Sequence, residues 1–143
     1  MAPDTRVFDP AMTPEMLMVG EVLKGYELRE IVGAGGQGTV YRAYQPIIDR
    51  EVVVKMIRGK YTNHPEFIRR FDSEAQVIAR LEHLHIVPLY DFWREPNSAY
   101  LVMRWMRGGC LSSSLGKNGP WSLRTSARLI EQLASALNAA HRN

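Results

Sequence analysis

The chain has 143 residues, the length of one domain or of part of one. Its hydrophobic content of 45% is enough for a core, and its charged content of 23% argues against wholesale disorder. The net charge of +3 is compatible with an anionic ligand, but it is too small and too dispersed to indicate nucleic-acid binding.

The cysteine content and the N-terminal sequence bear on the compartment. Cys110 is the only cysteine, so no internal disulfide can form, which fits a reducing compartment. No apolar stretch approaches the length of a membrane span, and no signal-peptide run follows Met1. We therefore expect a cytoplasmic protein, with no membrane segment in this part.

The first half of the chain predicts an arm and three strands. Residues 1–20 carry three prolines and scattered methionines, and we expect a flexible N-terminal arm with a short helical turn at 14–19. Runs of β-forming residues predict strands at 26–32, 39–44 and 51–57, with a glycine-rich turn between the first two.

The second half predicts two helices and two more strands. Apolar residues at helical spacing predict helices over 65–81 and 122–141, the second with Ser122 as its N-cap and with an apolar stripe formed by Leu123, Ala127, Ile130, Leu133 and Leu137. Strands are expected at 86–93 and 99–103, joined by a turn at 95–97. The order predicts an α+β fold with an antiparallel sheet of five strands.

The glycine-rich turn has the spacing G-x-G-x-x-G, from Gly33 to Gly38. Such a turn lets backbone N–H groups approach phosphate oxygens closely. A dinucleotide-binding fingerprint would open a helix after the last glycine, whereas here Thr39 and Val40 begin another β-rich run. The phosphate loop ending in Gly-Lys-Ser/Thr is absent because Thr39 follows Gly38. A hairpin without a ligand remains the alternative.

Lys55 strengthens the nucleotide interpretation. Side chains alternate faces along a strand, so Val53 and Lys55 share one face and Val52 and Val54 share the other. A nucleotide could then lie with its base near Val53 and its phosphates near Lys55. A solvent-facing lysine is the alternative.

Glu74 interrupts an apolar helix face. It lies between Phe67 and Phe71 on one side and Ile78 and Leu81 on the other. A carboxylate there is costly unless it is paired, and Lys55 is the obvious candidate partner. The alternative is a slightly rotated helix with Glu74 at the stripe edge.

These motifs together resemble the N-terminal lobe of a protein kinase, most closely the eukaryotic-like serine/threonine kinases of bacteria. The matching features are the glycine loop followed by Val40, Val52-Val53-Val54-Lys55, Glu74, His83-Leu84-His85-Ile86-Val87 and Tyr100-Leu101-Val102-Met103. The resemblance covers about residues 20–143 and implies an arm at 1–20, an N-lobe and hinge at 21–109, and the start of a C-lobe at 110–143.

The resemblance also implies roles for individual residues. Lys55 would contact the α- and β-phosphates of ATP and pair with Glu74. Met103 would be the gatekeeper, with Arg104, Trp105 and Met106 as the hinge, and Ile78 and Leu89 would belong to the hydrophobic spine. The implied ATP-binding residues are Val32, Gly33, Ala34, Gly35, Gly36, Gln37, Gly38, Thr39, Val40, Val53, Lys55, Met103, Arg104, Met106 and Cys110.

Three positions depart from the family pattern. Val53 replaces the usual alanine and would narrow the adenine slot, weakening ATP binding. Arg104 replaces a commonly acidic hinge residue, although the hinge contacts are made by backbone groups. Cys110 takes the place of a polar residue near the ribose, and it is either a reactive thiol at the pocket rim or an inert cysteine.

His83 and His85 do not predict a metal site, because no Cys or acidic cluster completes a ligand set. The Ser112–Ser114 run predicts a polar loop or a short helix.

The motifs that complete the family's chemistry are not found in these 143 residues. They are a catalytic loop with an aspartate base and an asparagine, and a metal-binding Asp-Phe-Gly. We expect a parent kinase that uses ATP and Mg²⁺ to phosphorylate protein Ser/Thr hydroxyls, and we expect the chain alone to be inactive and to bind ATP weakly. The alternative is a non-catalytic nucleotide-binding or kinase-like interaction module. The long helix's apolar stripe, without its packing partner, favours self-association.

Overall fold

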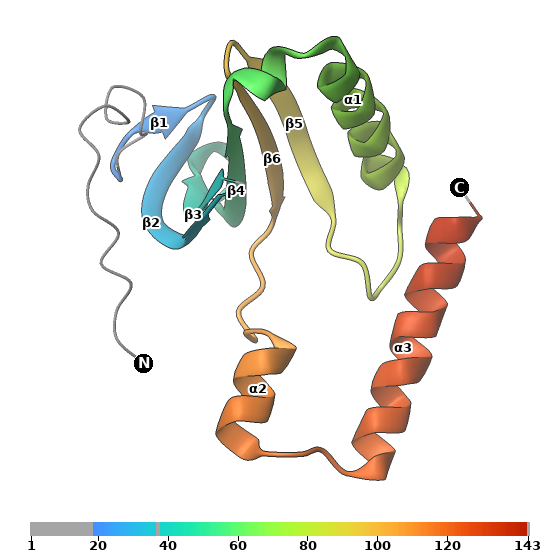
Figure 1. Cartoon of the computed structure of the whole chain (residues 1–143). Helices are drawn as coiled ribbons and strands as arrows, with labels where there is room; N and C mark the ends of the chain where they lie inside the picture. Colours follow the sequence, from blue (N-terminus) through green and yellow to red (C-terminus); the bar gives the residue numbers. More distant parts are fainter. Residues whose placement is uncertain (1–18, 37, 143) are drawn as a thin grey trace.

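A computed structural model describes residues 19–36 and 38–142 (Figure 1). Its centre is an antiparallel sheet of six strands in the order β1-β2-β3-β4-β6-β5. The strands are β1 (Val22–Leu23), β2 (Tyr26–Gly35), β3 (Gly38–Gln45), β4 (Arg50–Arg58), β5 (Leu89–Glu95) and β6 (Ser98–Arg104). The helices are α1 (Pro65–Arg80), α2 (Leu111–Asn118) and α3 (Leu123–His141), and 3-10 turns lie at η2 (Pro46–Ile48) and η3 (Lys60–Asn63).

The five predicted strands and two predicted helices are confirmed, with ends shifted by a few residues. The sixth strand, β1, is an addition: its two residues pair with β2 across a turn at Lys24 and Gly25, which have φ values of +49° and +85°. A strand of two residues is too short to show alternation in the sequence. Residues 1–18, which hold most of the predicted arm and of its helical turn, lie outside the described residues.

The sheet forms because alternate residues on its strands are apolar. On β4, Val52, Val54 and Met56 are buried, whereas Val53 and Lys55 on the opposite face are partly exposed. The core cluster comes entirely from strand residues: Tyr26, Leu28, Tyr41, Ala43, Val52, Val54, Met56, Trp93, Tyr100 and Val102. Burying one large apolar side chain contributes about 1.5–3 kcal/mol, so this face is the main source of stability.

Helix α1 lies beside β5 at the edge of the sheet (Figure 1). Pro65 begins the helix, where its missing N–H has no partner to lose. Phe71 packs edge-on against Phe92 of β5 at 6.2 Å between ring centres. Arg94 of β5 donates two hydrogen bonds, of 2.9 and 3.0 Å, to the carboxylate of Asp72 on α1. These contacts hold α1 to β5 rather than to β4.

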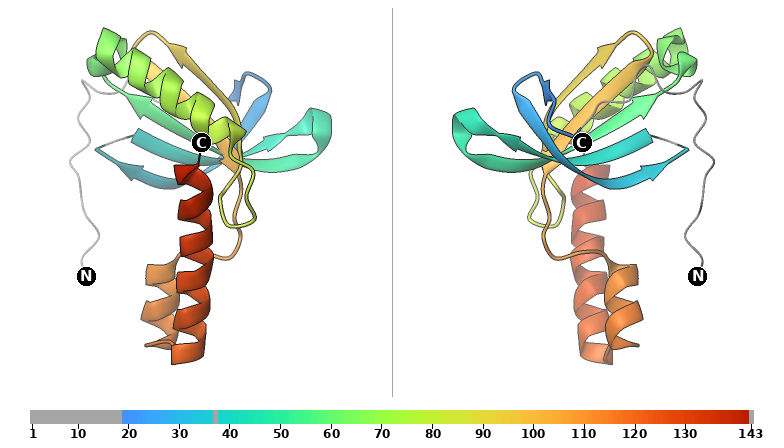
Figure 2. Two further views of the ribbon diagram at one scale, coloured as in Figure 1. Left: turned by 90° about the vertical axis from the view of Figure 1, so that its right-hand side faces the viewer. Right: turned by 90° about the vertical axis from the view of Figure 1, so that its left-hand side faces the viewer.

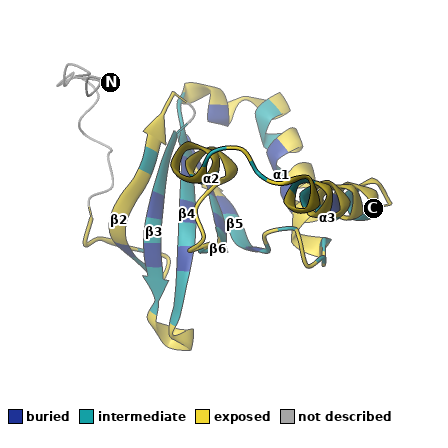
Figure 3. Ribbon diagram, turned by 90° about the horizontal axis from the view of Figure 1, so that it is seen from below, coloured by how far each residue is buried: buried dark blue, intermediate teal, exposed yellow. Residues whose placement is uncertain are grey.

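Helices α2 and α3 follow the chain segment that leaves β6, and both extend away from the sheet (Figures 1 and 2). Ser122 caps α3 as expected, because its side chain accepts a hydrogen bond from the Thr125 N–H at 3.2 Å. The serine run at 112–114 belongs to α2, so the short helix is the correct alternative. Viewed from below, both helices are mainly exposed while buried positions concentrate on the strands and α1 (Figure 3).

The apolar stripe of α3 is open to solvent. Leu123 is 91% exposed, Ile130 65% and Leu137 57%, and Ala136 is the one buried residue of the helix. Among the described residues, no helix combines the length and apolar character needed to cross a membrane.

Candidate nucleotide-binding site

The glycine-rich segment joins two strands, as expected. Gly35 and Gly38 form the last pair of the β2–β3 hairpin, so no helix follows the glycines and the dinucleotide fingerprint is excluded. Gly38 has φ +133°, and a Cβ atom there would overlap with the main-chain oxygen of Met56 on β4. The close approach of β4 therefore requires glycine at this position. Gln37 lies outside the described residues.

The sheet register brings the predicted site residues into neighbouring rows. Val40 lies opposite Gly33 on one side and opposite Lys55 on the other. Lys55 in turn lies opposite Leu101, and Val53 lies opposite Met103. The glycine hairpin, the lysine strand and the strand that leads to the hinge are thus adjacent.

The expected Lys55–Glu74 ion pair is not formed in this structure. Glu74 instead pairs with Arg70 one turn earlier on α1, at 3.6 Å, and its side chain is 64% exposed. Among the described residues, Lys55 takes part in no ion pair. The side-chain contacts described for α1 are to β5, and the Glu74 carboxylate lies in solvent with an i,i+4 arginine as its partner.

Between α1 and the sheet lies a cavity of about 580 Å³. Phe67, Phe71, Glu74 and Ile78 all line it together with the polar Glu66 and Arg70, so Glu74 borders the same space as the apolar side chains of the helix. Ile57 and Leu101 line the opposite wall, on the same sheet face as Lys55. Ile57 of the lysine strand and the helix α1 thus border the same space.

The expected hinge leaves the end of β6. The Arg104 N–H donates to the Pro88 carbonyl oxygen at 3.2 Å, and its side-chain Nε donates to the Tyr90 hydroxyl at 3.2 Å. Met106 is 54% exposed, and together with Arg104 it lines a second cavity of about 270 Å³, against the segment at 84–88 and α3. This cavity is separate from the one under α1.

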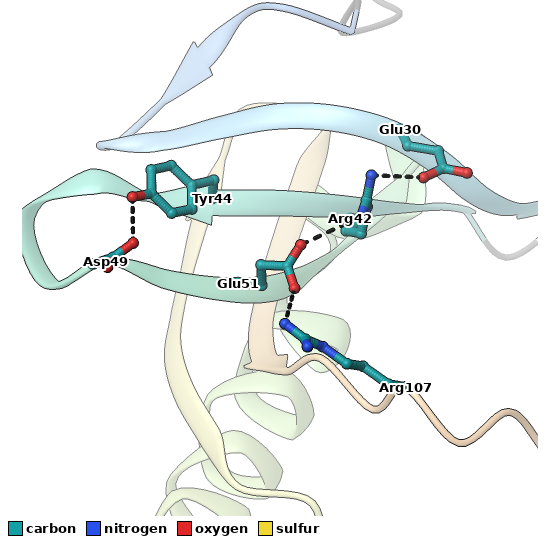
Figure 4. Close-up of polar contacts among 6 residues, drawn as sticks. All are labelled: Glu30, Arg42, Tyr44, Asp49, Glu51 and Arg107. Carbon is teal, nitrogen blue, oxygen red and sulfur yellow. Dashed lines mark hydrogen bonds and ion pairs between the residues drawn. The ribbon is translucent and has the colours of Figure 1, made fainter.

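Four charged residues, not anticipated from the sequence, form a chain across the same region (Figure 4). Arg42 on β3 bridges Glu30 on β2, at 3.1 Å, and Glu51 on β4, at 3.3 Å. Arg107, directly after the hinge, donates to the other oxygen of Glu51 at 2.6 Å. Alternation could have placed Arg42 and Glu51 on the face of Val53, but only the folded hinge brings Arg107 to them.

Cys110 is the N-cap residue of α2, and its thiol is exposed. Its Sγ lies 3.1 Å from the Ser112 hydroxyl and 3.2 Å from that of Ser113. Hydrogen bonds from Ser112 and then Ser113, together with their backbone groups, lower the pKa of the Cys110 thiol to about 7. The thiol is therefore partly thiolate near neutral pH, which favours the reactive alternative.

The two histidines have structural partners. His83 Nε2 is 2.8 Å from the Ser135 hydroxyl of α3, and its Nδ1 accepts a hydrogen bond from the His85 N–H at 3.0 Å. His83 thus connects the loop after α1 with α3.

The protein kinase domain family matches residues 26–143, so the chain belongs to the protein kinase family. It is 38% identical over 128 residues to the serine/threonine-protein kinase PrkC of Bacillus subtilis. This match covers 89% of this chain and 20% of PrkC. It is 37% identical over 129 residues to PknA of Mycobacterium tuberculosis, covering 86% of this chain and 30% of PknA. The chain is thus similar to serine/threonine kinases of bacteria, in agreement with the resemblance noted in its sequence.

Solved kinase structures agree with the fold. The kinase domain of Mycobacterium tuberculosis PknI superposes with a TM-score of 0.79 at 25% identity, over 89% of this chain and 51% of that chain. The predicted kinase-like fold, a sheet lobe with one adjoining helix and the start of a second lobe, is confirmed. The chain spans a fifth to a third of the curated relatives described above and about half of the PknI domain.

Proposed function

We propose that the chain is the ATP-binding part of a serine/threonine kinase that transfers the ATP γ-phosphate to protein hydroxyls. The observation that carries this proposal is the register that places the glycine hairpin, Lys55 and the strand before the hinge side by side. A backbone that approaches phosphates and an adjacent ammonium group are what a triphosphate requires.

In this proposal the adenine lies between Val32, Val40 and Val53, and its edge meets backbone groups of Arg104 and Met106. Val53 suits that use because it is partly exposed on the face of the site. The Arg104 N–H is already bonded to the Pro88 carbonyl oxygen, so the carbonyl group of Arg104 is the proposed hinge acceptor. Lys55 serves the α- and β-phosphates. Residues 21–109 are then the nucleotide lobe and hinge, and residue 110 starts the second lobe.

We propose Mg²⁺ binding only for a complete kinase domain. In this family the metal ligands are the Asp-Phe-Gly aspartate and the catalytic-loop asparagine, and the sequence of 143 residues has neither motif. We therefore expect the chain by itself to bind ATP weakly, with a Kd of about 1 mM, and to transfer no phosphate. A cytoplasmic site of action, where ATP is available, completes the proposal.

The direct test is titration of the chain with a fluorescent ATP analogue. Lys55→Met should weaken binding about tenfold, because it removes the charge beside the phosphates. Lys60→Met, at the exposed first residue of the turn η3, is the matched control and should bind as the parent chain does. Equal affinity of the two variants would contradict the proposed phosphate contact.

A second candidate is a non-catalytic interaction module, favoured by the exposed apolar stripe of α3. Incubation of the chain with radiolabelled ATP and a protein substrate tests activity directly. The reading frame downstream of Asn143 separates the candidates: continuation into His-Arg-Asp and Asp-Phe-Gly supports the kinase, and a stop codon supports the module.

A further inference from the structure

The hinge segment is anchored to β4 at two points. At its start, Arg104 of β6 pairs with Val52 of β4 in the sheet. At its end, the side chain of Arg107 reaches back to Glu51, the residue that precedes Val52 on β4. Trp105 and Met106 therefore lie on a short span whose two ends both meet β4.

Glu51 is well placed to hold this second anchor. It lies on the same strand face as Val53, two residues before it, so it borders the proposed adenine slot. Each of its oxygens has its own arginine partner, Oε1 with Arg42 and Oε2 with Arg107. The side chain is 32% exposed, compared with 79% for Arg107. The carboxylate is thus the less exposed and more firmly bonded member of the pair.

Arg42 completes the chain on the other side. Its guanidinium is shared between Glu30 and Glu51, which fixes it between β2 and β4 (Figure 4). Charges alternate along Glu30, Arg42, Glu51 and Arg107, so no member faces only a like charge. Such a network holds its geometry better than an isolated surface pair does.

We propose that Glu51 and Arg107, with Arg42 orienting the carboxylate, form a tether that holds the hinge against β4 and so positions the backbone that meets the adenine. These residues act through the hinge and are positioning residues. The inference rests on the proposed function for its nucleotide, but the tether itself is a property of the chain without ligand.

Amide hydrogen exchange of residues 102–104, the end of β6, tests the tether when it is measured without nucleotide, because the Arg104 N–H at the start of the hinge is hydrogen-bonded to the Pro88 carbonyl oxygen. Arg107→Gln and Glu51→Gln should each raise exchange in this segment about two- to five-fold, and the double variant should add little more because both single changes remove the same pair. Arg107→Lys keeps the charge and should retain most of the protection. Arg29→Gln, which breaks the exposed Arg29–Glu27 pair of 2.7 Å on β2, is the matched control and should leave the segment unchanged.

The affinity for a fluorescent ATP analogue tests the positioning role. Arg107→Gln and Glu51→Gln should raise Kd about two- to five-fold without additivity, while Arg29→Gln leaves it unchanged. Parent-like exchange in both variants would overturn the tether, and raised exchange with unchanged Kd would overturn the positioning role. If the parent chain binds no nucleotide, the proposed function fails instead, and the exchange data still decide whether the tether exists.

Discussion

A side chain at Gly38 would overlap with the main-chain oxygen of Met56 on the neighbouring strand. The last glycine of the motif is therefore required by the packing of the hairpin on β4, in addition to any role beside a phosphate. Its φ of +133° is also a conformation that L-residues rarely adopt.

Gly38→Ala should destabilise the chain by about 2 kcal/mol or more, since backbone strain of this kind costs about 1–3 kcal/mol before the overlap is added. Thermal or urea unfolding measures the loss. Gly35→Ala is the control, because a Cβ there meets nothing within 4 Å and its φ is not positive. Equal destabilisation by the two substitutions would show that the packing against Met56 is not the cause.

Glu74 and Lys55 should behave as independent residues in this chain. Glu74→Gln removes an exposed i,i+4 pair and should change stability by less than about 0.5 kcal/mol. It should also leave the affinity for an ATP analogue nearly unchanged, whereas Lys55→Met weakens it. A loss of affinity in Glu74→Gln as large as that in Lys55→Met would indicate that the two side chains pair when nucleotide is bound.

The thiol of Cys110 should titrate near pH 7. The rate of its reaction with iodoacetamide should rise as pH increases through 7 and level off above about pH 8, because the thiolate is the nucleophile. Replacing Ser112 and Ser113 together by alanine removes the lowering hydrogen bonds and should move the midpoint toward the ordinary thiol value. Ser114→Ala, without a contact to the sulfur, should keep the parent midpoint.

Val53→Ala should widen the adenine slot. We expect tighter binding of an ATP analogue, by about threefold, with a loss of stability of about 1 kcal/mol from the removed methyl groups. Val54→Ala on the opposite, fully buried face should cost about 2 kcal/mol and leave affinity unchanged, apart from the smaller folded fraction. Weaker binding in Val53→Ala would mean that the valine contacts the base favourably.

The exposed stripe of α3 should drive self-association. Sedimentation velocity of the chain should show species larger than the monomer, and replacing Ile130 and Leu137 by aspartate should shift them toward the monomer. Replacing the exposed, polar Arg124 and Arg128 by glutamine in the same helix is the control and should preserve association. A monomeric parent chain would contradict the expectation.

Most of the fold could be predicted from local patterns in the sequence. Alternation on β4 placed Val52 and Val54 inside and Val53 and Lys55 outside, and the helical spacing located α1 and the cap of α3. These features depend on near neighbours in the chain, so the sequence suffices to predict them. The strand β1 was missed because two residues show no pattern.

The tertiary details could not be predicted in the same way. The position of α1 depends on Arg94, Asp72 and Phe92, whose contacts pull the helix toward β5 and leave Glu74 beside Arg70. The position of Glu74 in an apolar stripe and the family pattern both suggested Lys55 as the partner, yet no local pattern indicates how far the helix stands from β4. The Arg107–Glu51 contact likewise joins residues 56 positions apart, and only the path of the hinge brings them together.

The strand order bears on how the protein folds. β1, β2, β3 and β4 are neighbours in both the chain and the sheet, so each joins the next through a short loop. The β4–β6 pairing instead requires closure of the long segment that contains α1 and β5, so we expect it to form later than the hairpins. In that order, Met103 and the hinge reach Val53 after the glycine hairpin and Lys55 are in place. The proposed adenine slot would then be completed by the same event that joins β6 to β4.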